Sequence, residues 1–140
     1  MAYCTEDDLF NMIPEEDLTD LTVESGDVPD STFVADAISK ADAEIDSYLG
    51  VKYVVPVSPT PDQVKALSVD LAIYHLYSRH SIIPPVRQQK YEDAVAFLKQ
   101  VAGGQAVITG PNGEGPTVAK DVTDVTSACR RFSRNSQWEW

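Results

Sequence analysis

The chain has few basic residues and few cysteines, and each shortage excludes a class of protein. It holds 11 Lys or Arg residues against 22 Asp or Glu in 140 positions, so its formal net charge is −11 at pH 7. General binding to duplex DNA and docking on an anionic membrane both rely on Lys and Arg, so neither is expected. Two cysteines, Cys4 and Cys129, form no disulfide scaffold and fit no CxxC metal spacing.

Long apolar runs and targeting signals are also missing. No stretch approaches the roughly 18 apolar residues of a membrane-spanning helix, and the first residues are acidic where a signal peptide is basic. We therefore expect a soluble, cytosolic protein. A chain of 140 residues with 43% hydrophobic residues is large enough for one stable core without a metal or a disulfide.

Signatures of catalysis are absent as well. His75 and His80 stand five positions apart, which places them some 140° apart around a helix, too far for one metal ion. The acidic residues form no calcium loop, no Gly-Lys-Ser/Thr follows the glycines, and there is no G-x-S-x-G sequence. We predict no catalytic, cofactor-binding or metal-binding residue, and a protein that is not an enzyme.

Apolar spacing indicates a mainly α fold. Val34, Ile38, Ala41 and Ile45 follow one another at steps of four, three and four, which is one face of a helix. Similar patterns predict three principal helices packed as a small bundle, at about residues 31–49, 60–80 and 86–102. Two short acidic helices are expected before them, one near residues 5–10 and one at 14–21. The acids Asp36, Glu44 and Asp46 lie off the apolar face and are expected in water.

Particular residues predict where the helices begin and end. Thr5 precedes an acid by three positions, as in a capping box. Thr60, followed by Pro61 and Gln63, predicts a capping box at the start of the second long helix. Gly50 stands where a left-handed residue ends a helix.

The chain changes character after residue 102. Residues 105–109 and 117–122, separated by a turn rich in glycine, predict a C-terminal β-hairpin or extended arm. The last residues, from 128 on, have no helical or strand period and are read as an extended tail. We therefore divide the chain into a helical domain, residues 1–102, and an arm with its tail, residues 103–140.

The tail combines guanidinium and aromatic groups, which are enriched at protein–protein hot spots. The predicted partner-interface residues are Arg130, Arg131, Phe132, Arg134, Trp138 and Trp140. A local contact with nucleic acid and a plain unstructured end are the other two interpretations of this composition.

Four blocks of sequence resemble a known family. They are MAYCTEDDL at residues 1–9, ADAEIDSYLG at 41–50 followed by Val55-Pro56, DLAIYHLY at 70–77 followed by Arg87 and YEDA at 91–94, and RFSRN at 131–135. Together they look like the phage Mu-like family of small head–tail morphogenesis proteins of tailed phages and prophages. Residues 103–127 carry the least resemblance.

The resemblance implies a structural role. It suggests a head–tail connector or head-completion adaptor that forms a homo-oligomeric ring beneath the portal, often a dodecamer in related siphophage adaptors. The partners would be further copies of the chain and portal or tail-completion proteins, in the virion neck and, during assembly, in the host cytoplasm. DNA would pass through the channel without being bound specifically.

The charge distribution agrees with assembly through unlike surfaces. Residues 1–50 carry 14 acids and one base, whereas residues 51–140 carry 8 acids and 10 bases. A ring needs a head-to-tail interface, and two unlike halves can supply it. Two alternatives stay open: an acidic binding module that mimics DNA or regulates a nucleic-acid enzyme, and a small metal-dependent hydrolase.

Overall fold

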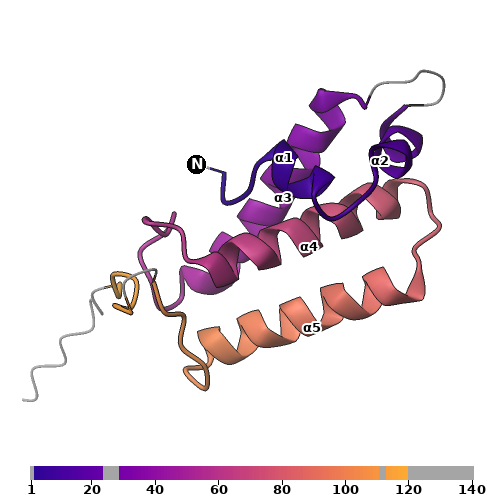
Figure 1. Ribbon diagram of the computed structural model, residues 1–140. Coiled ribbons are helices and arrows are strands. Elements are labelled where there is room, and N and C mark those ends of the chain that lie inside the picture. Colours follow the sequence, from indigo (N-terminus) through magenta and orange to yellow (C-terminus); the bar gives the residue numbers. More distant parts are fainter. Residues whose placement is uncertain (1, 24–28, 111–112, 120–140) are drawn as a thin grey trace, which may run out of the picture.

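The computed structural model describes residues 2–23, 29–110 and 113–119 (Figure 1). This part of the chain forms five helices and no strand: α1 (Glu6–Phe10), α2 (Glu15–Thr22), α3 (Ser31–Leu49), α4 (Asp62–Arg79) and α5 (Pro85–Ala102). The prediction of a mainly α protein with three long helices is confirmed. The predicted bounds differ from the observed ones by at most two residues for the long helices.

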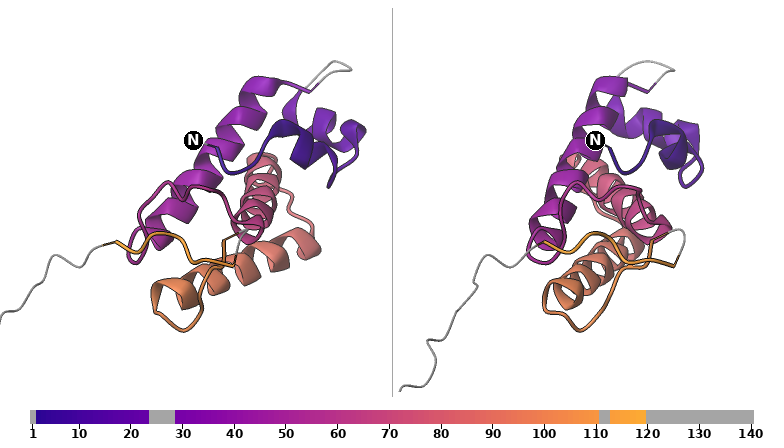
Figure 2. Two further views of the ribbon diagram at one scale, coloured as in Figure 1. Left: turned by 60° about the vertical axis from the view of Figure 1, so that its left-hand side comes forward. Right: turned by 90° about the vertical axis from the view of Figure 1, so that its left-hand side faces the viewer.

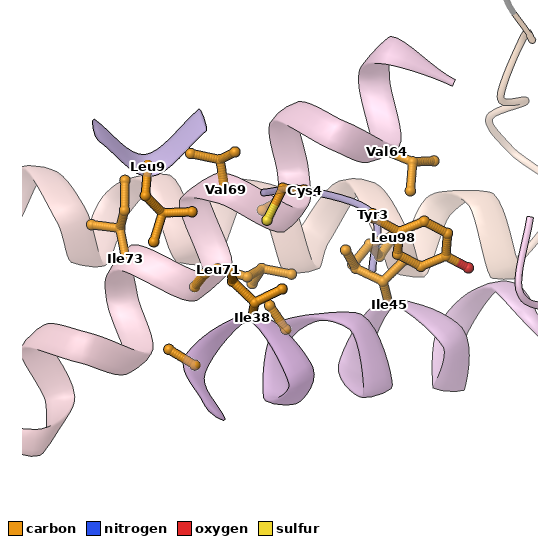
Figure 3. Packing of buried hydrophobic residues seen from close by; sticks show 14 of the residues in the cluster. Tyr3, Cys4, Leu9, Ile38, Ile45, Val64, Val69, Leu71, Ile73 and Leu98 are labelled. Carbon is orange, nitrogen blue, oxygen red and sulfur yellow. The ribbon is translucent and has the colours of Figure 1, made fainter. Parts of the chain in front are cut away.

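Helix α4 is the centre of the molecule, because it packs against both α3 and α5, which also touch each other. Its buried residues include Val64, Leu71, Ile73 and Leu76. Figure 3 shows how the core brings together side chains of the N-terminal segment, α3, α4 and α5. Each fully buried large apolar side chain stabilises the fold by about 1.5–3 kcal/mol.

Two helix starts are capped by side chains. At α1, the Thr5 backbone N–H donates to Asp8 Oδ2 at 2.9 Å, which confirms the predicted capping box. At α3, Asp30 Oδ1 accepts from the Thr32 N–H at 2.9 Å. Asp30 is therefore the N-cap of α3.

Two predicted caps are wrong. Helix α4 begins at Asp62 with Pro61 in the capping position, and no side chain caps it. Because the helix starts one residue later than expected, Thr60 lies outside the position from which a hydroxyl reaches the first turn. Gly50 has a φ of −60°, so it is not left-handed. It is needed because a Cβ there would lie 2.9 Å from the Asp46 carbonyl oxygen.

The segment after α5 folds back along the loop between α3 and α4 (Figure 2). Val118 forms an isolated antiparallel bridge with Tyr53, the Val54 N–H donates to the Thr117 oxygen at 2.9 Å, and the Ala119 N–H donates to the Lys52 oxygen at 2.8 Å. The predicted hairpin extends over residues 111–112 and 120–122, which lie outside the described part. Within the described part, residues 105–109 form no strand.

Among the described residues, none of the helices combines the length and the apolar character that crossing a membrane requires.

Candidate functional site

Tyr3 fixes the N-terminal segment to two parts of the fold, α3 and the loop before α4. Its backbone N–H donates to Asp42 Oδ2 on α3 at 3.2 Å, and its hydroxyl donates to the Asp46 carboxylate. The Val57 N–H, in the loop before α4, donates to the same hydroxyl at 2.9 Å. Burial and the bond to Asp46 raise the pKa of Tyr3 far above its usual value. The hydroxyl is therefore a fixed structural contact.

A series of buried, hydrogen-bonded polar groups continues from Tyr3 toward α4. The Ser68 hydroxyl donates to Asp42 Oδ1 at 2.8 Å and lies 3.2 Å from Cys4 Sγ. Burial raises the pKa of both Asp42 and Cys4, although hydrogen bonds from Ser68 and from the Tyr3 N–H partly offset the effect at Asp42. A thiol with a raised pKa is a poor nucleophile, so Cys4 is suited to packing rather than to catalysis.

An open groove of about 610 Å³ lies beside these hydrogen-bonded side chains, between residues 2–6 and α3. Ala35, Ser39 and Ala43 line it with small side chains, and Val34 and Ile38 add apolar surface. Three carboxylates also line it, from Glu6, Asp42 and Asp46. The described residues bring no Lys, Arg or His to its wall, so the groove is acidic.

A second polar cluster joins the three long helices. Glu44 on α3 contacts His75 Nε2 on α4 at 3.2 Å through Oε2, and accepts from the Tyr91 hydroxyl on α5 at 2.9 Å through Oε1. Tyr91 also stacks on Tyr74, with ring centroids 3.9 Å apart. Burial, followed by the bond to Glu44, raises the pKa of Tyr91 to about 12. The expectation that Glu44 and Asp46 lie in water is wrong, because both are half-buried and accept hydrogen bonds.

The end of α4 is tied to α2 and α3. His80 Nε2 lies 2.8 Å from the Leu21 carbonyl oxygen, and because a carbonyl only accepts, this nitrogen carries the proton. The Arg79 guanidinium stacks over the Phe33 ring at 3.5 Å and donates to the Thr22 oxygen at 3.3 Å. Both histidines thus make contacts that join helices.

Large apolar side chains are exposed at two opposite ends of the helix pair α4–α5. At one end, Ile82 is 78% exposed and Val86 67% exposed; we call these two residues the turn patch. At the other end the exposed residues are Val51, Val54, Val107 and Val118, which we call the loop patch. Helix α5 separates the two ends by about 27 Å at 1.5 Å per residue. Exposed apolar side chains on one surface are typical of interaction sites when they form a contiguous patch.

Within the described ranges, no three His, Cys, Asp or Glu side chains converge in the way that a metal ion requires. The polar clusters contain no exposed nucleophile paired with a base, and their members bond to one another across helices.

The predicted interface residues Arg130, Arg131, Phe132, Arg134, Trp138 and Trp140 lie outside the described part of the chain, as does Cys129. The groove and the two apolar patches were not predicted. For Asp42 a signal existed: it follows Ile38 by four positions and precedes Ile45 by three, which places it on the apolar face. No sequence pattern marks Tyr3 as the partner of Asp46, because that contact depends on how the segments pack.

Comparison with known proteins identifies the family. The family described as "Bacteriophage Mu, Gp36" matches residues 3–127. The Mu-like prophage FluMu protein gp36 of Haemophilus influenzae is 33% identical over 92 residues, which cover 66% of this chain and 63% of the relative. Gene product J of Escherichia phage Mu is 30% identical over 115 residues, which cover 78% of this chain and 77% of the relative.

The alignment with the Haemophilus relative thus spans less than two thirds of that protein's length, whereas the alignment with the phage Mu relative spans more. The family match includes the N-terminal segment, all five helices and residues 103–119. The resemblance to a phage Mu-like family is therefore confirmed, and this chain belongs to the bacteriophage Mu gp36 family.

Proposed function

We propose that this chain is a structural phage morphogenesis protein, and specifically a non-enzymatic head–tail connector or head-completion adaptor that assembles as a ring on the portal. Its family membership supports a role in phage biology. The finer role is supported by the shape and surface chemistry of the described fold.

The observation that carries the proposal is the pair of exposed apolar patches at opposite ends of α4 and α5. Ile82 and Val86 form one end, and the loop patch forms the other. A closed ring needs a heterologous interface, in which one surface meets a different surface of the next copy. Two separate apolar surfaces on one rigid helical body meet this requirement.

Charge supports a role beside DNA without specific binding. The exposed face of α2 carries Glu15, Glu16, Asp17 and Asp20. If these acids face the channel, they repel the phosphates of passing DNA and limit its adhesion. The tail residues Arg130, Arg131, Phe132, Arg134, Trp138 and Trp140 are proposed to contact the portal or a tail-completion protein in the virion neck.

The experiment is assembly of the purified full chain with the cognate portal protein. Size-exclusion chromatography with light scattering gives the mass, and electron microscopy gives the shape. We expect co-elution and a ring of regular symmetry on one face of the portal. Failure to bind the portal, together with a constant single-chain mass at rising concentration, would overturn the adaptor proposal.

The exposed acids of α2 favour a second candidate, an acidic module that mimics DNA. In the described part of the chain, none of these four acids forms an ion pair. A DNA mimic would compete with duplex DNA for a basic DNA-binding protein. Replacing all four acids with Gln or Asn would abolish that competition, whereas ring formation through the apolar patches would persist.

A further inference from the structure

The groove between residues 2–6 and α3 has the form of a binding channel for an extended segment. Its α3 wall consists of Ala35, Ser39 and Ala43, which are exposed and small, so that a second chain can approach the helix closely. Val34 and Ile38, which are buried in the core, form an apolar floor beside this wall. The volume of about 610 Å³ is sufficient for several side chains.

The charge of the groove identifies the chemistry of its occupant. Glu6, Asp42 and Asp46 line it, and the described residues supply no cation to it. Asp42 is engaged by Ser68 and Tyr3, whereas Glu6 makes no hydrogen bond to a described side chain. An occupant that carries guanidinium groups and one apolar anchor would complement both the carboxylates and the apolar surface.

The chain itself contains such a segment. Residues 130–134 read Arg-Arg-Phe-Ser-Arg, with three cations around one aromatic ring. The seven Lys and Arg residues of the described part are spread over the other surfaces; Lys65, for example, pairs with Asp8 at 2.9 Å and Lys90 lies 3.5 Å from Asp70.

The described chain ends close to the groove. The Ala119 N–H donates to the Lys52 oxygen at 2.8 Å, and Val57, in the same loop, contacts the Tyr3 hydroxyl at 2.9 Å. Tyr3 in turn bonds to Asp46, at one end of the groove. The ten residues 120–129 span up to about 33 Å when extended, and the groove follows some 23 Å of α3. The linker is therefore long enough for residues 130–134 to reach the groove of their own chain.

We propose that residues 130–134 dock in this groove on the same chain before assembly, with the arginines against Glu6 and Asp46 and Phe132 against Val34 and Ile38. Docking on the same chain is favoured because a short tether gives an effective concentration near the millimolar range. The contact belongs to the free chain and does not require the proposed ring.

The test compares the backbone amide NMR signals of wild type with those of a tail variant. Both are full-length chains in solution, at a concentration where light scattering shows single chains. The variant Arg130→Gln/Arg131→Gln/Arg134→Gln removes the cations from the tail. We expect its amide signals to differ from wild type at Ala35, Ser39 and Ala43 and to coincide at Ala96, an exposed α5 residue. Identical groove signals in the two proteins would overturn the proposal.

Two further variants separate docking from an indirect effect. Ala43→Arg places a cation in the groove. We expect this change in the groove to prevent docking as well, which is seen as shifts of the amide signals of residues 130–134. Ala96→Arg, the matched control on α5, leaves those signals unchanged. Tenfold dilution of wild type also leaves them unchanged; a shift on dilution would place the contact between two copies and contradict docking within one chain. Ring formation with the portal is measured separately, so failure of docking leaves the adaptor proposal intact.

Discussion

The hydroxyl of Ser68 on α4 donates to the carboxylate of Asp42 on α3 at 2.8 Å, and both side chains are buried. The same carboxylate accepts the Tyr3 N–H at 3.2 Å, so the N-terminal segment, α3 and α4 meet at one acidic group. A buried charge is costly unless it is hydrogen-bonded, and here the two bonds offset part of that cost. This junction forms part of the groove wall.

Removing the carboxylate is expected to destabilise the fold. Asp42→Ala leaves the Tyr3 N–H without its acceptor and the Ser68 hydroxyl with only the weak acceptor Cys4 Sγ, 3.2 Å away, and an unpaired buried group costs about 1–3 kcal/mol. Chemical denaturation followed by circular dichroism measures the change. Asp36→Ala, at an exposed position of the same helix, serves as the control and is expected to stay close to wild type. Equal stability of Asp42→Ala and wild type would contradict the assigned role.

The pH dependence of Asp42 can be isolated with an isosteric variant. Its pKa is raised by burial, so the folded chain binds this proton more tightly than the unfolded chain does. Wild type should therefore gain stability relative to Asp42→Asn as the pH falls through the raised pKa, and the gain is complete below the ordinary carboxyl pKa. Denaturation curves of both proteins between pH 7 and roughly pH 4 measure the difference. A constant difference, or one of opposite sign, would show that the pKa of Asp42 is not raised.

Two buried tyrosines give a matched pair of variants. Tyr3→Phe removes a hydroxyl that bonds to Asp46 and Val57, and we expect a loss of about 1–3 kcal/mol because the buried Val57 N–H loses its acceptor. The Tyr53 hydroxyl is buried and has no hydrogen-bond partner among the described residues. Tyr53→Phe is therefore expected to be neutral or stabilising. Thermal unfolding of the two variants should rank them in this order, and the reverse ranking would argue against these contacts.

Deleting residues 128–140 tests the part played by the tail. The described residues form a buried core among themselves, so the helical circular dichroism signal of the truncated chain should be retained. Assembly with the portal is expected to be lost, because the proposed contact residues are gone. Retained assembly would count against a portal contact through the tail.

The helices could be predicted from sequence because each long helix buries one regular face. Ile38, Ala41 and Ile45 are all buried at the spacing that the sequence displays. The capping residue of α4 could not be predicted from the same information. Thr60 and Gln63 fit the capping pattern, but the helix begins at Asp62, so Pro61 occupies the capping position, Thr60 lies outside it and Gln63 lies inside the helix.

The candidate sites were less accessible to sequence reasoning. The Tyr3–Asp46 contact joins residues 43 positions apart, and no local pattern encodes it. The loop patch depends on residues 113–119 lying against the α3–α4 loop, as the Tyr53–Val118 bridge shows. The exposure of Ile82 and Val86 likewise depends on how the molecule packs, because an isoleucine or a valine in a sequence is ordinarily expected to be buried.

Head-to-tail assembly through unlike ends is tested most directly by mixing two variants, each with one patch disrupted. Ile82→Asp disrupts the turn patch and Val51→Asp the loop patch, both at exposed positions, and Ala96→Asp is the matched control. With the portal present, the control should form the ring and neither patch variant alone should do so. Mixed together without portal at high concentration, the two patch variants retain one intact surface each and should form a dimer that stops there. If both variants alone form the same assemblies as wild type, or if their mixture stays monomeric while wild type assembles, the two patches are not the joined surfaces.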